Sequence, residues 1–137
     1  MTPERKLHLK VCQHLKLFYP HVYFDSDPSG LKVSGLMATL LQKTRSDHKH
    51  LDITIYKKFR TYSGLIIELK AETIYKKDGQ IKSSEHLDGQ DKTKKLLELE
   101  GFKVEIAWEF EEVERILVDY LGEPVQEPDE FFDRYKV

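Results

Sequence analysis

The chain has 137 residues, of which 22 are Lys or Arg, 24 are Asp or Glu and 6 are His, so its formal net charge is −2. This length suits one domain with a core of its own. The apolar fraction of 39% excludes a disordered chain, and the single cysteine, Cys12, excludes a disulfide scaffold and a Cys-rich zinc site. No apolar run approaches the ~20 residues of a membrane helix, and the N-terminus shows no secretion signal. We therefore expect a soluble, cytoplasmic protein without a membrane partner.

Charge is distributed unevenly along the chain. Residues 1–97 carry 18 Lys and Arg against 11 Asp and Glu, a net charge of +7, whereas residues 98–137 carry 4 against 13, a net charge of −9. A basic body indicates an anionic partner such as nucleic acid, although two ordinary solvated faces would give the same totals. The acidic end would limit non-specific binding to nucleic acid or keep the protein in solution.

The first predicted elements are two helices with a short strand between them. Thr2 is a good N-cap and Pro3 suits the first helical position, so a helix is expected from Pro3 until Pro20 ends it. A short strand is expected at residues 22–24, and a short helix at residues 35–42 after a turn-rich loop. His8 and His14 are interpreted as surface residues of the first helix.

Two strands are predicted in the middle of the chain. Residues 51–56 alternate, so Leu51, Ile53 and Ile55 are expected on one face of a strand and Asp52 on the other. Residues 64–70 are almost continuously apolar, which is typical of a central strand that is buried on both faces.

The remaining elements are a helix at residues 84–100, a strand at residues 102–108 and a helix at residues 111–121. Gly101 is a natural residue after the end of the first of these helices. The whole order of elements predicts a mixed α/β layer arrangement.

Asp52, Glu68 and Lys70 form the candidate site. Glu68 and Lys70 are two positions apart in one strand and share a face, and Asp52 joins them if the two strands pair as a hairpin. Two carboxylates in close approach repel each other, and Mg²⁺ would relieve that repulsion because it binds one or two carboxylates together with waters and phosphate oxygens. The predicted chemistry is attack by a metal-activated water on a phosphodiester, with the lysine ammonium beside it. An exposed strand pair and a simple turn residue are the structural alternatives.

Asp52, followed after fifteen residues by Glu68-Leu69-Lys70, resembles the motif of the PD-(D/E)XK nuclease superfamily. The surrounding sequence resembles the virus-type replication-repair nuclease (VRR-NUC) branch of that superfamily over residues 4–122, although Leu51 stands where the motif has a proline. The resemblance implies a restriction-endonuclease-like three-layer core, with a central mixed β-sheet flanked by helices. Residues 1–122 would form this nuclease domain, and residues 123–137 an acidic C-terminal tail.

The resemblance also assigns roles to individual residues. Four residues fall on the family's catalytic positions: Asp52, Glu68, Lys70 and Gln90. Asp52, Glu68 and the main-chain carbonyl of Leu69 would hold Mg²⁺, with Mn²⁺ as a substitute. Glu4 on the first helix is a further candidate ligand, although a carboxylate at a helix start also suits the helix dipole. A plain surface amide is the alternative for Gln90.

The implied activity is that of a Mg²⁺- or Mn²⁺-dependent deoxyribonuclease. It would be a homodimeric endonuclease acting on branched or junction DNA in replication, recombination or repair, in a bacterial or phage-infected cell. Seven basic residues, most of them in a stretch expected beside the site, are candidate contacts to the DNA backbone: Lys43, Arg45, Lys49, Lys57, Lys58, Arg60 and Lys94. The alternatives are a non-catalytic nucleic-acid-binding module on the same fold and a small interaction protein that acts through its acidic tail.

Overall fold

A computed structural model describes residues 2–27, 34–70 and 85–125, the side chains of residues 85–88 excepted. The predicted order of elements is confirmed, with these bounds: α1 (Pro3–Phe18), β1 (Phe24–Ser26), α2 (Gly35–Thr44), β2 (Ile53–Ile55), β3 (Gly64–Leu69), α3 (Glu85–Leu99), β4 (Phe102–Ala107) and α4 (Phe110–Leu121). The strand expected at residues 22–24 is displaced to β1. Residue 84, where the helix over residues 84–100 was expected to begin, lies outside the described residues, as does most of the acidic tail expected at residues 123–137. None of the helices in the described part of the chain has the length and hydrophobicity needed to cross a membrane.

The strands form one mixed sheet in the order β1-β2-β3-β4. β2 pairs with β1 and with β3 in antiparallel fashion, and β3 pairs with β4 in parallel across the connection that contains α3. The predicted hairpin is therefore confirmed. Its register sets Ile53 against Ile67 and Ile55 against Leu65. Continuing this register by one position brings Asp52 opposite Glu68.

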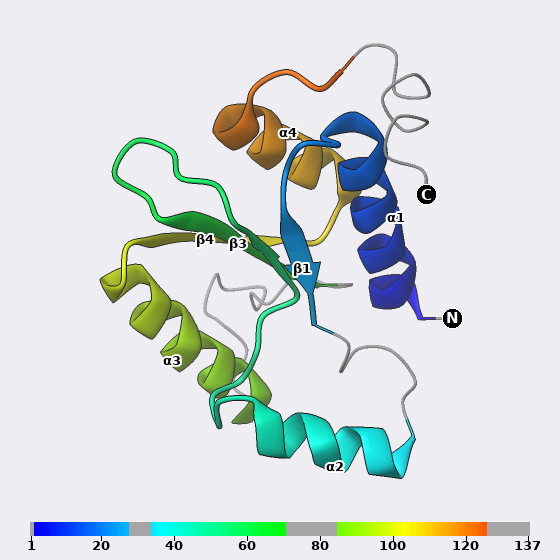
Figure 1. Ribbon diagram of the computed structural model, residues 1–137, viewed down its shortest axis with the longest axis vertical. Helices are drawn as coiled ribbons and strands as arrows, with labels where there is room; N and C mark the ends of the chain where they lie inside the picture. The colour runs from blue at the N-terminus through cyan, green and yellow to red at the C-terminus, as the bar shows by residue number, and fades with distance from the viewer. Residues whose placement is uncertain (1, 28–33, 71–84, 126–137) are drawn as a thin grey trace, which may run out of the picture.

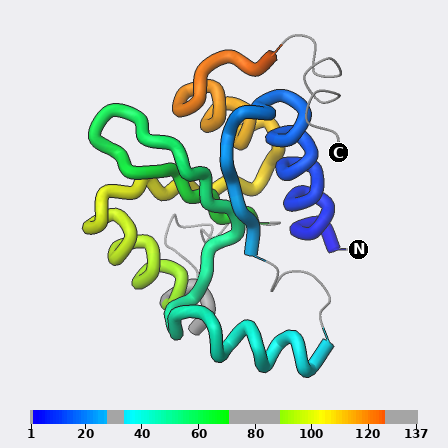
Figure 2. Tube along the Cα trace, viewed as in Figure 1, coloured from blue at the N-terminus to red at the C-terminus, as the bar shows by residue number. Residues whose placement is uncertain are grey.

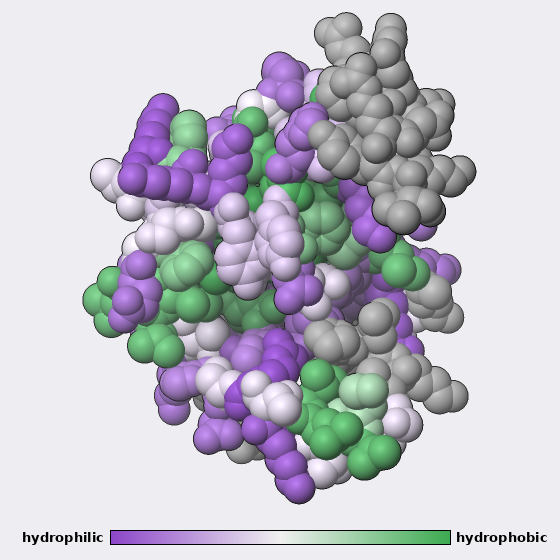
Figure 3. Space-filling model, viewed as in Figure 1, coloured by the Kyte–Doolittle hydropathy of each residue, from purple (hydrophilic) through white to green (hydrophobic). Residues whose placement is uncertain are grey.

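Helices lie on both faces of the sheet. Figure 1 shows α1 and α4 together on one side of the sheet and α3 on the other, a mixed α/β arrangement compatible with three layers. α2 differs from the other helices, because it has no buried residue and lies at the edge of the molecule, away from α1 and α4 (Figure 2). Apolar surface gathers over α2 in Figure 3, where Leu36, Met37 and Leu40 are exposed.

The main core lies between α1, α4 and the sheet. Its fully buried members include Val11 and Leu15 of α1 and Leu117 of α4. All six residues of β3 are buried, as its continuous apolar sequence predicts, because helices cover both of its faces. The chain after α4 returns to α1, where the Val125 N–H donates to the Phe18 carbonyl at 3.0 Å.

One predicted face is wrong. Leu51 does not share a face with Ile53 and Ile55, which belong to the main core. It packs instead with Ile66 and Val104 in a smaller cluster that includes Leu97 of α3. The physical reason is a bend at Asp52, after which β2 begins, so the regular alternation of a strand does not extend back to Leu51.

Candidate active site

The central strands and α3 bring three polar side chains together in the interior. Glu68 is 4% exposed, and Lys70 and Gln90 are each 8% exposed. Burial of such groups is costly unless they are paired. The alternatives of an exposed strand pair for Glu68 and Lys70 and of a surface amide for Gln90 are therefore wrong.

Gln90 connects the other two side chains. Its Nε2 donates a hydrogen bond to Glu68 Oε1 at 2.7 Å, and its Oε1 accepts one from Lys70 Nζ. Lys70 Nζ also lies 3.6 Å from Glu68 Oε1, and the Lys70 backbone N–H is held by the Ala107 carbonyl at 2.8 Å. An amide in the second turn of α3 thus fixes the relative positions of the Glu68 carboxyl group on β3 and the Lys70 ammonium directly after it.

Asp52 lies across the hairpin from Glu68. Its Oδ2 accepts a hydrogen bond from the Leu69 N–H at 2.7 Å, and its own N–H donates to Glu68 Oε2 at 3.3 Å. Its carbonyl accepts from the Asp27 N–H at 2.7 Å, which ties the segment to the end of β1. The bend before β2 is therefore held on both sides, and it directs the Asp52 carboxylate towards the end of β3.

The two carboxyl groups influence each other strongly. Burial and the neighbouring Asp52 charge raise the pKa of Glu68 from 4.5 to about 8, and the opposing attraction of Lys70 does not cancel these effects. Glu68 is therefore protonated at neutral pH in the metal-free protein, and a side-chain hydrogen bond to Asp52 also favours the protonated form. The proton on Glu68 removes one of the two negative charges of this carboxyl pair, and a divalent cation would compensate both charges.

The donor set suits a hard divalent cation. The described part of the chain contains no group of three or more His, Cys, Asp and Glu side chains arranged to hold a metal ion. A cation at this place would thus use the two carboxylates, the main-chain oxygen of Leu69 and water molecules. Mg²⁺ commonly uses one or two carboxylates and keeps several waters, so these residues fit the group.

A pocket of about 280 Å³ lies on the α1 side of Asp52. It is lined by Thr2, Glu4, Arg5, His8, Asp52 and Leu69. The structure therefore places Glu4 and Leu69 beside Asp52, as the resemblance implies. A ligand role for Glu4 stays a prediction.

Lys49 is a predicted DNA contact that lies close to the site. It lines an open groove of about 660 Å³ that runs over Ile66 and Thr54 of the sheet to Thr93 of α3. Its aliphatic chain lies against Gly89, where an added Cβ would stand 2.7 Å from Lys49 Cγ. The lysine is thereby held next to the residue that precedes Gln90.

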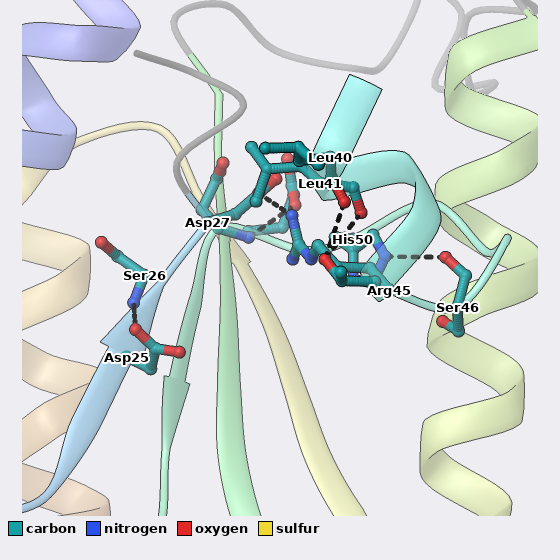
Figure 4. Close-up of polar contacts among 11 residues, drawn as sticks. Asp25, Ser26, Asp27, Leu40, Leu41, Arg45, Ser46 and His50 are labelled. Carbon is teal, nitrogen blue, oxygen red and sulfur yellow. Dashed lines mark hydrogen bonds and ion pairs between the residues drawn. The ribbon is translucent and has the colours of Figure 1, made fainter. Parts of the chain in front are cut away.

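Arg45 has a structural partner. Its guanidinium Nη1 lies 2.6 Å from Asp27 Oδ1, and Asp27 is 7% exposed. Figure 4 shows Arg45 reaching from the end of α2 to Asp27 at the end of β1, with the His50 ring close to the Ser46 carbonyl. Part of the Arg45 charge is therefore balanced within the fold, whereas Lys43 is exposed at the end of α2.

The other predicted DNA contacts lie in two places. Lys94 is half-buried on α3. Lys57, Lys58 and Arg60 follow β2 and precede β3, at the opposite end of the hairpin from Asp52 and Glu68. The expectation that the whole basic stretch lies beside the carboxylates is wrong for these three residues, because the hairpin runs its full length between them and the site.

His8 is the residue that the sequence interpretation missed. It is 8% exposed and lines the Asp52 pocket, whereas a surface position was expected. The helical spacing of His8 with Val11 and Leu15 could have indicated its burial. The surface position expected for His14 is also wrong: this half-buried ring packs against Phe18 and Phe110, with centroid separations of 4.8 and 5.3 Å.

Comparison of the chain with protein-family models, with curated proteins and with solved structures finds no match. The resemblance to nucleases therefore depends on the sequence pattern alone. The geometry of the residues around Asp52 and Glu68 supports a function independently of that pattern.

Proposed function

We propose that the chain is a metal-dependent DNA endonuclease that hydrolyses phosphodiester bonds on a restriction-endonuclease-like, VRR-NUC-type fold. The buried arrangement of two carboxyl groups with a lysine and a glutamine carries this proposal. Its members come from the bend before β2, from the end of β3 and the residue that follows it, and from α3, and each has a hydrogen-bonded partner within the set. Such a cluster adds little to the stability of a fold, because the cost of burying charged groups offsets the attraction between them.

Asp52 and Glu68, with the Leu69 carbonyl, would hold Mg²⁺ or Mn²⁺. When bound, the cation would make a water more acidic and offset the negative charge of a phosphate group. The Lys70 ammonium would add a fixed positive charge where charge develops on the phosphate. Gln90 holds that ammonium and the Glu68 carboxyl group in place, so it is a positioning residue.

The groove beside the site offers Lys49 as a contact for a polyanion. Asp25 and Asp27 also line this groove, and Asp27 is paired with Arg45. Lys49 lies next to the α3 residue that precedes Gln90. A lysine binds phosphates without reading base sequence, so we expect cutting that is selective for DNA structure, with branched or junction DNA preferred. Binding should weaken steeply as salt concentration rises.

The decisive experiment is cleavage of labelled single-stranded, duplex, flap, splayed-arm and four-way-junction DNA with Mg²⁺, Mn²⁺ or EDTA. Wild type should cut only with metal, and the near-isosteric variants Glu68→Gln and Lys70→Met should each be slower by about 10²-fold or more. Lys103 and Glu105 provide a matched control, because this pair on β4 has the same 3.6 Å separation as Lys70 and Glu68 but is about one-third exposed. Lys103→Met and Glu105→Gln should cut at the wild-type rate.

Two results would contradict the proposal. If the wild type cuts no DNA with either metal, or if Glu68→Gln cuts as fast as wild type, the chain is not a nuclease of this design. DNA binding without cutting would then favour the non-catalytic module. The homodimer stays a separate prediction, which sedimentation of the wild type beside a Leu36→Glu variant on the exposed face of α2 would check.

A further inference from the structure

The pocket between α1 and Asp52 carries an inference that rests on the proposed function and deepens it. Of the residues that form the site, Asp52 and Leu69 line this pocket, and the other described residues that line it belong to the N-cap and the first two turns of α1. Its volume of about 280 Å³ compares with roughly 30 Å³ for one water molecule in the liquid. A phosphate group and several waters would fit within it.

His8 is the residue of this pocket that lacks a role in the fold. Its side chain is more than nine-tenths buried, yet no described residue forms a hydrogen bond with its ring. Every fully enclosed side-chain nitrogen or oxygen of the described residues has a hydrogen-bond partner. Because the His8 ring has no such partner, its nitrogens are not enclosed, and they face the open space of the pocket that His8 lines. Buried polar groups in native proteins have partners, and a buried ring that points into a pocket indicates a ligand there.

The walls of the pocket have opposite electrical character. On one side, the N-terminal turn of α1 has the positive end of the helix dipole, and Arg5 adds a guanidinium. On the other side lies the Asp52 carboxylate, and Glu4 adds a second carboxylate to the lining. The carboxylates would repel an anion alone, and Arg5 would repel a cation alone. A phosphate that arrives with a divalent cation satisfies both walls.

We propose that His8 contacts the DNA phosphate group that this site cleaves, by donating a hydrogen bond from its ring to a non-bridging phosphate oxygen. The α1 side of the pocket is thus the substrate side of the site, and the ends of β2 and β3 are its metal side.

Direct binding can be measured without any cleavage. In protein labelled with ¹⁵N-histidine, the ring signals of His8 are those missing from a His8→Gln sample. Adding thymidine 5′-monophosphate with Mg²⁺ should shift the His8 signals and leave those of His14, on the same helix but packed among aromatic rings, unchanged. An unmoved His8 at nucleotide concentrations far above millimolar would overturn the proposal, as would equal shifts for His14.

Kinetics provide the second readout. A hydrogen bond to a charged group accounts for roughly 10- to 100-fold in rate or binding, so His8→Leu, which fills the space but cannot donate, should lower kcat/KM by about that factor. His8→Gln retains a donor and should recover part of the loss, which a purely structural role would not predict. His14→Gln should cut as wild type does. If His8→Leu does not fold, the glutamine variant and the nucleotide titration decide the question.

The two proposals fail in different ways. If Glu68→Gln abolishes cutting but His8→Leu cuts at the wild-type rate, the nuclease stands and the role of His8 falls. If no DNA is cut by wild type, the proposed function falls, and the nucleotide titration still shows whether the His8 pocket binds a phosphate.

Discussion

Replacing Glu68 by glutamine should change how the stability of the metal-free protein depends on pH. Burial and Asp52 raise the pKa of Glu68 from 4.5 to about 8 in the folded protein. Between these two values the native state binds a proton that the unfolded state releases. The stabilisation linked to this group is therefore complete below about pH 4.5 and is lost as pH rises to about 8.

The size of the effect follows from the same two values. Each pKa unit corresponds to about 1.4 kcal/mol, so ionising Glu68 in the fold costs about 5 kcal/mol as an upper limit. Glu68 is 4% exposed, so solvent screens this cost little. Glu68→Gln removes the titrating group but keeps an acceptor for Gln90 Nε2. As pH rises from about 5 to about 8, the free energy of unfolding of Glu68→Gln should therefore fall less than that of wild type.

Urea denaturation in EDTA across this pH range measures the difference directly. Other groups also make stability depend on pH, equally in wild type and in Glu68→Gln. Burial lowers the pKa of His14, for example, so the stability linked to its neutral ring is lost as pH falls below about 6.5 in both proteins. Mg²⁺ should stabilise wild type more at pH 8 than at pH 5, and it should stabilise Glu68→Gln less at both. Parallel pH profiles for wild type and Glu68→Gln would refute this account of the carboxyl pair. The free energy of unfolding of the control variant Glu105→Gln should change with pH in parallel with that of wild type.

Three further variants test individual contacts. Gln90→Leu leaves the Lys70 ammonium without its amide acceptor and Glu68 Oε1 without its donor, and it should cost about 1–3 kcal/mol in urea denaturation and slow cutting about 10- to 100-fold. Arg45→Met should lower the melting temperature by the equivalent of about 1 kcal/mol, because Asp27 loses a partner whose side chain is itself 26% exposed; an unchanged melt would show that the pair is incidental. Leu117→Ala should cost about 2–5 kcal/mol in the same assay, whereas Leu36→Ala on α2 should change stability by less than about 0.5 kcal/mol.

The parts of the site that lie within one strand were predictable from local pattern. Glu68 lies near the end of β3 and Lys70 directly follows the strand, so the alternation of side chains in an extended chain places both on one face, where both contact Gln90. Gln90 was predicted only through the family resemblance. It comes from a helix after a long connection, and tertiary packing alone brings it within 2.7 Å of Glu68.

The errors have an equally physical origin. Leu51 was placed by alternation, but alternation describes a strand, and the strand begins only at Ile53, after the bend. The sequence interpretation of His8 is a surface position, whereas its spacing to Val11 and Leu15 places it on the buried side of α1. Arg45 looked like a free cation because its partner, Asp27, lies eighteen residues earlier and is brought to it by the fold.

The first helix links the core to the site. Val11 and Leu15 are fully buried against the sheet, and His8 and Glu4 continue the same side of the helix towards its N-terminus. With a rise of about 1.5 Å per residue, His8 lies only about 4.5 Å along the axis from Val11. The helix therefore cannot shift against its core contacts without moving His8 relative to Asp52. In the proposed enzyme, the packing that stabilises the domain also sets the width of the pocket in which the phosphate would bind.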